Sequence, residues 1–190
     1  MYPITRSLMK ALAATAALAA AAVLLLLGYR QYARAAYPVY FAPEVTQAAA
    51  ETGLPQSLLY AVIRTESGFH PQAVSSVDAR GLMQITPDTF SWVRYRLGES
   101  GGTQPDLLFD PQQNIYYGSH TLALLVQEFG TIETALAAYH AGWGNVTRWL
   151  QDERYSADGQ TLDAIPFGDT NHYVNKVLQT AEQYQKIYKL

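Results

Sequence analysis

The sequence contains no cysteine. This absence excludes a disulfide framework, a thiolate metal site, a thiol nucleophile and a lipid-modified N-terminal cysteine. Charge is also scarce, because Asp, Glu, Lys and Arg make up 15% of the 190 residues. Beyond residue 36 the chain carries 9 Lys and Arg against 16 Asp and Glu. A nucleic-acid partner is therefore not expected, since phosphate binding relies on clustered cations.

The sequence also lacks any clustering of its histidines. Zinc sites typically take pairs of ligands that lie a few residues apart. The four histidines are scattered along the chain: His70, His120, His140 and His172. We therefore expect no metal site and no cofactor.

A long apolar run lies near the N-terminus. Residues 11–28 are uncharged and consist almost wholly of Ala, Leu and Val, with Arg6 and Lys10 before them. This pattern predicts a single hydrophobic helix within residues 1–36, acting as a signal peptide or a membrane anchor of an exported protein. Both interpretations stay open. The run is just short of the roughly 20 residues that span a bilayer, and Ala33-Arg34-Ala35 has the small-x-small pattern of a cleavage site.

Residues 37–190 are enough for one hydrophobic core of ordinary size. Helix start signals (Pro, Thr and Asp) alternate there with glycine stops, and few alternating runs indicate strands. We predict one mostly α domain with a Gly-rich surface loop over residues 99–108. The predicted helices cover 42–52, the segment opened by Pro55, the segment capped by Thr86, then 110–129, 131–141, 145–151 and 170–188.

Glu66 is the candidate catalytic residue. It follows Leu59 and Ile63 by seven and three residues, so its carboxyl emerges on the apolar face of the predicted helix. Desolvation on that face raises the pKa of a carboxyl, which then keeps its proton near neutral pH as a general acid must. The residues alone leave an alternative open, in which Glu66 pairs with Arg64 or Arg80 or is solvated at the end of the helix.

Four sequence blocks follow one another after this point. In these blocks the chain resembles the soluble lytic transglycosylase catalytic domain, a relative of goose-type lysozyme, from about Tyr37 to the C-terminus. The resemblance implies a lysozyme-like helical fold for residues 37–190. The blocks are Glu66-Ser67-Gly68 leading through Ser75 to Gly81-Leu82-Met83-Gln84-Ile85-Thr86-Pro87, Asn114-Ile115 with Gly118, Ala135 to Gly142 with Gly144, and Ile165 to Thr170 followed by Tyr173-Val174.

The same resemblance implies roles for individual residues. Glu66 is expected to act as catalytic acid and base, and Ser75 to form a hydrogen bond near its carboxyl. Met83 and Gln84 are expected to line the glycan cleft, where Met83 offers an adaptable apolar wall and Gln84 hydrogen-bonds the amino sugar. The residues alone leave an alternative open, in which Met83 belongs to the core and Gln84 is a capping side chain. Tyr139 is expected to contact the substrate beside the scissile bond, or the catalytic glutamate itself.

Three positions depart from the family pattern. Asp169 stands where the family usually carries Glu, and it is interpreted either as a substrate contact or as the N-terminal cap of the final helix. His140 replaces the usual Asn and adds a group that titrates near neutral pH. Asp78 replaces the usual Gly, and a left-handed backbone conformation is expected to accommodate it.

The resemblance further implies cleavage of the β-1,4 bond between N-acetylmuramic acid and N-acetylglucosamine, with formation of 1,6-anhydromuramoyl ends. One carboxyl suffices for this reaction, because the C6 hydroxyl of the substrate attacks the anomeric carbon, whereas ordinary glycosidases need two. The alternatives are a hydrolytic muramidase that uses Asp78 or Asp169 as second acid, and a peptidoglycan-binding protein without activity.

The expected partners are peptidoglycan glycan strands, and the membrane if the N-terminal helix is not cleaved. The expected location follows from the same choice. An uncleaved helix predicts a membrane protein with an extracytoplasmic catalytic domain, and a cleaved one predicts secretion to the cell wall or periplasm. The sequence gives no indication of an oligomeric state.

Overall fold

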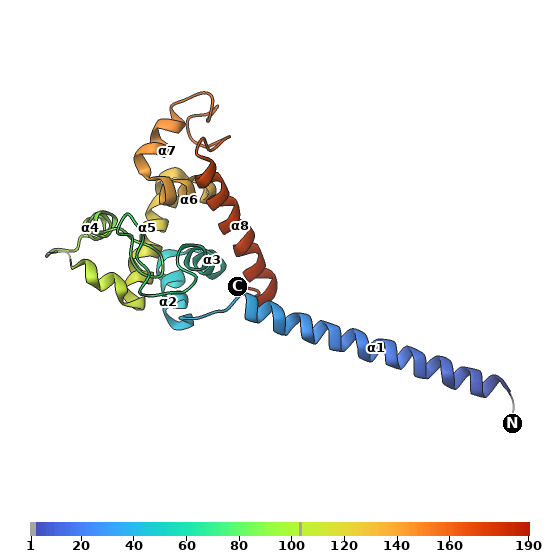
Figure 1. Ribbon diagram of the computed structural model, residues 1–190. Helices are drawn as coiled ribbons and strands as arrows, with labels where there is room; N and C mark the ends of the chain where they lie inside the picture. The colour runs from blue at the N-terminus through green and yellow to red at the C-terminus, as the bar shows by residue number, and fades with distance from the viewer. Residues whose placement is uncertain (1–2, 103) are drawn as a thin grey trace. The chain divides into compact units, whose positions relative to one another are not determined.

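The computed structural model describes residues 3–102 and 104–190, shown as ribbons in Figure 1. The chain divides into two compact units, Met1–Pro38 and Val39–Leu190. Residues 1 and 2 of the predicted N-terminal segment, and Thr103 of the predicted loop, lie outside the described residues. The two units are described separately below.

The first unit is one helix, α1 (Pro3–Ala36), which confirms the prediction of a single N-terminal hydrophobic helix. Its segment Arg6–Ala36 has a mean hydropathy of 2.3, and large apolar side chains such as Leu25 are exposed along it. At about 1.5 Å per residue, such a helix is longer than the roughly 30 Å of a bilayer's hydrocarbon core. By length and composition, α1 can therefore cross a membrane.

The second unit confirms the mostly α prediction. In its described residues, the regular structure is helical apart from two isolated β-bridges, which Arg80 forms with Val74 and Ile85. The helices are α2 (Ala42–Thr52), α3 (Gln56–Glu66), α4 (Pro87–Arg96), the 3-10 helix η1 (Pro105–Phe109), α5 (Pro111–Phe129), α6 (Ile132–Ala141), α7 (Trp143–Leu150) and α8 (Gly168–Tyr188).

Several helices begin where the sequence places a capping residue. The side chains of Thr86, Asp110 and Thr131 each accept a hydrogen bond from the backbone amide three residues later, at the starts of α4, α5 and α6. The stops are equally local, because Gly53 and Gly130 adopt left-handed conformations after α2 and α5. These boundaries match the predicted ones.

Two predictions about the C-terminal half are corrected. Helix α7 begins at Trp143, two residues before its predicted start, directly after Gly142. Helix α8 begins at Gly168, and Phe167 occupies its N-cap position. Asp169 is therefore not the cap of this helix. It lies in the first turn, where its Oδ1 accepts a hydrogen bond from the amide of Thr170 at 2.9 Å.

The predicted loop 99–108 is also partly wrong, because η1 occupies its end. Leu108 lies within this 3-10 helix and is fully buried. Burial of one large apolar side chain fixes the backbone there, although the glycines and polar residues before it favour a loop.

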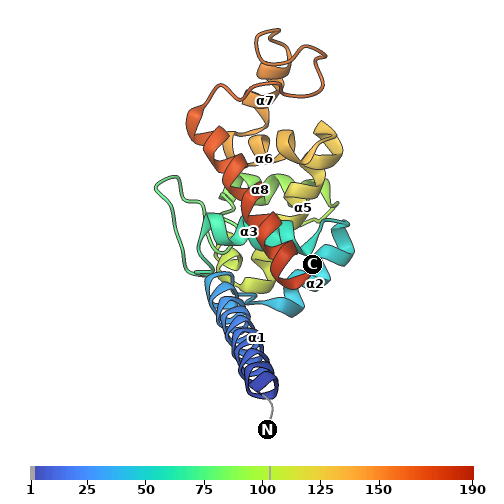
Figure 2. The same ribbon diagram turned by 90° about the vertical axis from the view of Figure 1, so that its right-hand side faces the viewer.

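The packing of α3 against α8 positions the candidate site. Figures 1 and 2 show α8 packed across α3, and between these two helices the rings of Tyr60 and Tyr184 stack at 5.2 Å. Helix α5 contacts α2, α4, α6 and η1, so it forms the centre of the unit. The last residue of α3, Glu66, is thereby held against the N-terminal half of α8.

Candidate active site

Glu66 meets a tyrosine from the other end of the domain. The Tyr173 hydroxyl, on α8, donates a hydrogen bond to Glu66 Oε1 at 2.7 Å. Tyr173 is buried and Glu66 is half-buried. The carboxyl therefore lies at the edge of the core, where its partner is a buried phenol.

Burial raises the pKa of Glu66 from 4.5 to about 7. The hydrogen bond from Tyr173 and the positive charge of Lys176 act in the opposite direction, but both effects are smaller than desolvation. Burial and the neighbouring Glu66 carboxylate also raise the pKa of Tyr173 well above its ordinary value, so the phenol stays a donor at neutral pH. A carboxyl that is half protonated near pH 7 can serve as an acid and, after giving up its proton, as a base.

His140 supports this pair from the side. Its ring stacks on the Tyr173 ring with centroids 4.5 Å apart, and its Nδ1 lies 3.1 Å from Thr170 Oγ1. Burial lowers the pKa of His140, and the carboxylate of Asp169 acts against this shift. The imidazole thus fixes the ring that holds Glu66.

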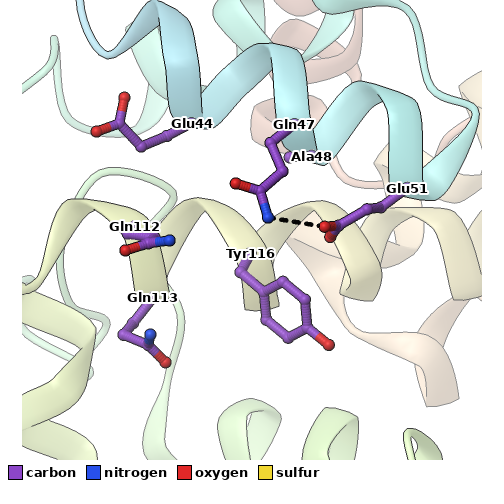
Figure 3. A pocket seen from close by; sticks show the side chains of 7 residues that line it. All are labelled: Glu44, Gln47, Ala48, Glu51, Gln112, Gln113 and Tyr116. Carbon is purple, nitrogen blue, oxygen red and sulfur yellow. Dashed lines mark hydrogen bonds between the residues drawn. The ribbon is translucent and has the colours of Figure 1, made fainter.

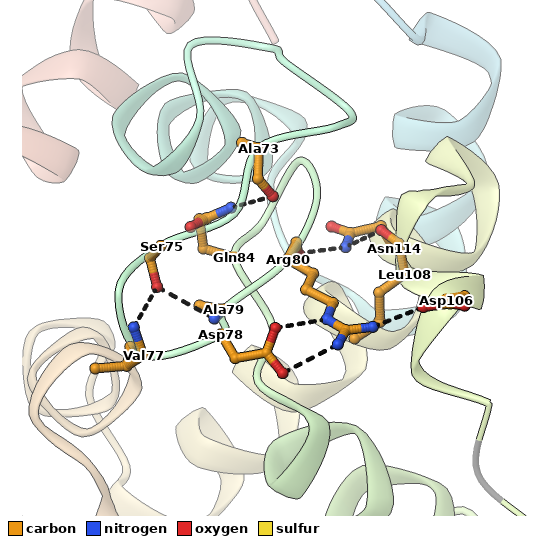
Figure 4. A network of polar contacts seen from close by, with 10 residues as sticks. All are labelled: Ala73, Ser75, Val77, Asp78, Ala79, Arg80, Gln84, Asp106, Leu108 and Asn114. Atoms are coloured by element: carbon orange, nitrogen blue, oxygen red, sulfur yellow. Dashed lines mark hydrogen bonds and ion pairs between the residues drawn. The ribbon is translucent and has the colours of Figure 1, made fainter.

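The segment from Arg80 to Ile85 is held through its backbone. Asn114 of α5 is fully buried, and its Nδ2 donates to the carbonyls of Arg80 and Leu108, each at 2.8 Å (Figure 4). Its Oδ1 accepts from the Met83 amide at 2.7 Å. One carboxamide therefore satisfies three backbone groups, two in the Arg80–Ile85 segment and one in η1, which explains the Asn-Ile block at this position.

Two further side chains tie this segment to the site. The Ser67 hydroxyl, next to Glu66, donates to the Leu82 carbonyl at 2.8 Å, and the Tyr139 hydroxyl donates to the Met83 carbonyl at 2.7 Å. Burial and the nearby Glu66 carboxylate raise the pKa of Tyr139 well above its ordinary value. The segment and the Glu66 carboxyl therefore share one frame of hydrogen bonds.

Glycines permit the close packing beneath this segment. Gly81 has a φ of 73°, and a Cβ there would lie 2.1 Å from the Leu108 carbonyl oxygen. A Cβ on Gly118 of α5 would lie 2.5 Å from the Met83 sulfur. A side chain at either position would clash with these atoms and push the segment away from α5, so only glycine fits there.

Two of the predicted site residues line a cleft, and a third is buried beneath it. Gln84 and Tyr139 line one cleft, together with residues of α4, α5 and the α6–α7 turn. The cleft has a volume of about 320 Å³. Met83 is fully buried against Gly118, so it supports the cleft from beneath and does not form its wall as predicted.

Ser75 organises a turn. Its Oγ accepts hydrogen bonds from the amides of Val77 and Ala79, at 3.2 and 3.1 Å (Figure 4). Nearby, Gln84 Nε2 donates to the carbonyls of Ala73 and Gly81, at 3.2 and 2.9 Å. The Ser75 contact with Glu66 and the Gln84 contact with a sugar stay predictions.

The two candidate second acids are both exposed. Asp78 adopts the expected left-handed conformation, with a φ of 60°, and its two oxygens accept from Arg80 at 2.8 and 3.0 Å (Figure 4). That guanidinium lowers the pKa of Asp78. Asp169 is exposed at the start of α8. In the described part of the chain, no three His, Asp or Glu side chains converge on a point that would hold a metal ion.

A second hollow lies between α2 and α5 (Figure 3). None of the predicted site residues lines it, and Gln47 already donates to Glu51 there at 2.8 Å. The candidate active site is therefore Glu66 together with the cleft that Gln84 and Tyr139 line; Glu66 itself is not among the residues that line this cleft, and Tyr139 lies close enough to interact with both. The residues of the second hollow are Glu44, Gln47, Ala48, Glu51, Gln112, Gln113 and Tyr116.

Tyr173 is the partner of Glu66 that the sequence does not reveal. The Tyr173-Val174 pair belonged to the last block, but the signal for its role was absent, because 107 residues separate it from Glu66. Its burial on the face of α8 that packs on α3 follows from the helical period, yet the partner of its hydroxyl is set by the tertiary fold.

The fold and the site together describe a lysozyme-like helical domain with a desolvated carboxyl at a helix end. The sequence matches the family model of the transglycosylase SLT domain over residues 44–161. The chain therefore belongs to the transglycosylase SLT domain family. The matched range contains Glu66, Ser75, Met83, Gln84 and Tyr139, and it ends before Asp169 and Tyr173.

Named relatives agree with this assignment. The soluble lytic murein transglycosylase of Escherichia coli (strain K12) is 37% identical over 134 residues, which cover 70% of this chain and 21% of that protein. Membrane-bound lytic murein transglycosylase C of Yersinia pestis (strain Pestoides F) is 33% identical over 167 residues. This match covers 77% of this chain and 47% of that protein. The chain thus spans less than half the length of these curated relatives.

A solved structure shows the same fold. The crystal structure of the 70 kDa soluble lytic transglycosylase from Escherichia coli matches with a TM-score of 0.72 and 32% identity, over 81% of this chain and 25% of that one. The prediction of a lysozyme-like helical domain related to this family is confirmed.

The raised pKa of Glu66 predicts a pH-dependent stability. Between pH 4.5 and about 7 the unfolded chain releases the Glu66 proton while the folded chain keeps it, so folding weakens as the pH rises through this window. The Glu66→Gln variant lacks this penalty. We expect it to be roughly 2 to 3 kcal/mol more stable than the parent above pH 7 and equally stable below pH 4.

Urea unfolding of the full chain in detergent, at several pH values, measures this difference. Glu133→Gln on α6 is the matched control, because Glu133 is exposed and its replacement should leave the pH dependence unchanged. Equal pH dependence for the parent and Glu66→Gln would contradict the raised pKa.

Proposed function

We propose that the chain is a peptidoglycan lytic transglycosylase, which cleaves the β-1,4 bond between N-acetylmuramic acid and N-acetylglucosamine and leaves a 1,6-anhydromuramoyl end. The observation that carries this proposal is the Glu66 carboxyl, which is desolvated and bonded to Tyr173. The names of the relatives support it, since they are lytic murein transglycosylases.

In the proposed reaction, protonated Glu66 gives its proton to the glycosidic oxygen, and the bond between that oxygen and the anomeric carbon breaks. The electron pair leaves with the N-acetylglucosamine side, and positive charge develops on the muramic ring. The C6 hydroxyl of the same ring then attacks the anomeric carbon and returns its proton to Glu66. Neither water nor metal is consumed, and the enzyme ends in its starting state.

Tyr173 assists both steps of this proposed cycle through its hydrogen bond to Glu66. After the first step Glu66 is ionised in a partly apolar place, and the Tyr173 hydroxyl, at 2.7 Å from Oε1, stabilises that charge. This donor also fixes the direction of the carboxyl, so its proton is delivered along one line. Stacking on His140 keeps the Tyr173 ring in place during both steps.

The remaining predicted residues have proposed roles in binding. Gln84 and Tyr139 line the cleft, where they lie within reach of a bound glycan. Ser75 and Asp169, which do not line this cleft, are proposed as further contacts of the strand. Met83 acts from below, because its side chain is fully buried and its carbonyl accepts the Tyr139 hydrogen bond.

The hydrolytic alternative requires a second carboxylate near the anomeric carbon. Asp78 is a poor candidate, because both of its oxygens are bonded to Arg80. Asp169 is exposed and its carboxylate accepts from the Thr170 amide. The geometry therefore favours a reaction that needs one acid.

Digestion of purified sacculi by the full chain, followed by mass spectrometry of the muropeptides, tests the proposal. We expect anhydromuramoyl products from the parent, and a loss of activity of at least ~1000-fold in Glu66→Gln, because the amide has no proton to give. Glu133→Gln, on the exposed face of α6, is the control and should digest like the parent.

The other outcomes are distinct. Products that are heavier by one water, with reducing ends, would show a hydrolytic muramidase. If sacculi bind the parent and yield no products, the chain would be a binding protein without activity.

We also propose that α1 is retained as a membrane anchor, with residues 39–190 outside the cytoplasmic membrane, where peptidoglycan lies. Two features support retention: α1 is long enough to span a bilayer, and Tyr29 and Tyr32 are exposed at the end of its apolar run. Tyrosines in this position are typical of a membrane–water interface. One of the relatives is named membrane-bound.

Extraction of membranes with alkaline carbonate tests the anchor. The chain should stay in the membrane fraction with the full mass of 21.0 kDa. A soluble product that lacks the first 30 to 40 residues, as roughly expected for a cleaved signal, would contradict retention.

A further inference from the structure

His140 covers the tyrosine that holds Glu66. Its imidazole stacks on the ring of Tyr173 with centroids 4.5 Å apart and an angle of 28° between the two planes. The hydroxyl of the same tyrosine donates to Glu66 Oε1 at 2.7 Å. Tyr173 is buried, whereas His140 is exposed, so a proton from solvent can reach the imidazole. A change in the charge of His140 therefore acts one ring away from the Glu66 carboxyl.

The hydrogen bond to Thr170 indicates which proton the imidazole carries. Thr170 of α8 is 1% exposed, and its Oγ1 lies 3.1 Å from His140 Nδ1, its partner among the described residues. A hydroxyl has one proton to donate, and a buried donor without an acceptor costs free energy. The arrangement that satisfies Thr170 is therefore a neutral imidazole in which Nδ1 accepts and Nε2 carries the proton.

A second proton on the imidazole would reverse this hydrogen bond. Both ring nitrogens are donors in the charged form, so Nδ1 could no longer accept from Thr170. The Thr170 hydroxyl would become a buried donor without an acceptor, which disfavours the stacked position of the ring. The positive charge would also stabilise ionised Glu66 and make it a weaker base toward the C6 hydroxyl. Both effects act against the proposed reaction.

The surroundings of His140 favour its neutral form at neutral pH. The titratable groups that face it are Tyr173 and Asp169, both on α8. Burial lowers the pKa of His140 from 6.5, and the Asp169 carboxylate acts against this shift. Helix α6 also packs on α5 and α7, but in the described part of the chain neither helix presents a charge that shifts this pKa. Since the pKa of Glu66 is about 7, a pH range exists in which Glu66 is protonated and His140 is neutral.

We propose that His140 is a positioning residue whose neutral imidazole holds Tyr173 against Glu66, and that protonation of this imidazole sets the acid limit of activity. The inference rests on the proposed function for the reaction that is limited. The Asn that the family usually carries at this position has a carboxamide, which can accept from Thr170 but does not titrate. The acid limit is therefore specific to the histidine.

The pH profile of kcat/KM tests this role, with the full chain in detergent and soluble uncrosslinked glycan strands as substrate. The parent should lose activity on the alkaline side as Glu66 is ionised, and on the acid side by about tenfold per pH unit as His140 is protonated. His140→Asn should stay within about threefold of the parent near neutral pH and lose only the acid side. His140→Ala should be weaker at every pH, since it has neither an acceptor nor a ring.

Each rate is divided by that of the parent at the same pH, which cancels any titration of the substrate. His172→Asn is the matched control, because His172 is an exposed histidine of α8 directly before Tyr173, and its ratio should stay constant. A merely structural role for His140 would lower the rate without changing the shape of the profile. An unchanged acid side in His140→Asn would overturn the proposal and leave the reaction standing.

Nitrogen NMR of the imidazole separates this role from the reaction. In the full ¹⁵N-labelled chain in detergent, the His140 signals are those that His140→Asn lacks. At neutral pH they should show a proton on Nε2 and none on Nδ1, and they should titrate below pH 6.5 together with the ring signals of Tyr173. A proton on Nδ1 at neutral pH, or Tyr173 signals that do not follow His140, would contradict the proposal at any level of activity. The expected NMR result without cleavage by the parent at any pH would contradict the reaction and support the contact between His140 and Tyr173.

Discussion

The site depends on one hydrogen bond, between the Tyr173 hydroxyl and the Glu66 carboxyl. It joins α3 to α8 across 107 residues of sequence. The bond forms only because these two helices pack against each other and bring the two side chains within hydrogen-bonding distance. The bond lets a carboxyl be desolvated without being left unsatisfied, which a buried acid requires. The stacking of Tyr60 on Tyr184 and of His140 on Tyr173 then keeps α8 in register with the rest of the site.

The other side of the cleft is built from backbone groups. Ser67, Asn114 and Tyr139 each hold a carbonyl or amide of residues 80–83. These hydrogen bonds involve the backbone of residues 80–83, so the path of this segment does not depend on which side chains it carries toward a ligand. The glycines at 81 and 118 matter for the same reason, since any Cβ would open the contact between this segment and α5.

Much of the fold could be predicted because its signals are local. Caps at Thr86, Asp110 and Thr131 and stops at Gly53 and Gly130 act within one helical turn. Predictions failed where tertiary packing decides: η1 forms because Leu108 is buried, and the start of α8 lies before the capping residues that the sequence offers. The apolar stripe of α3 placed Glu66, but its partner Tyr173 has no local signal, because 107 residues separate the two. The apolar pair Leu82-Met83 is compatible with the core as well as with a cleft wall, and the packing of Met83 on Gly118 decides for the core.

The proposed chemistry requires Glu66 to keep its proton near neutral pH. A titration of the Glu66 side-chain carboxyl by ¹³C NMR, on the full chain in detergent, measures this directly. The structure predicts a pKa of about 7, with the Tyr173 hydroxyl still protonated throughout. A pKa near 4.5, the ordinary value of a glutamate, would show a solvated carboxylate and contradict the desolvation of Glu66.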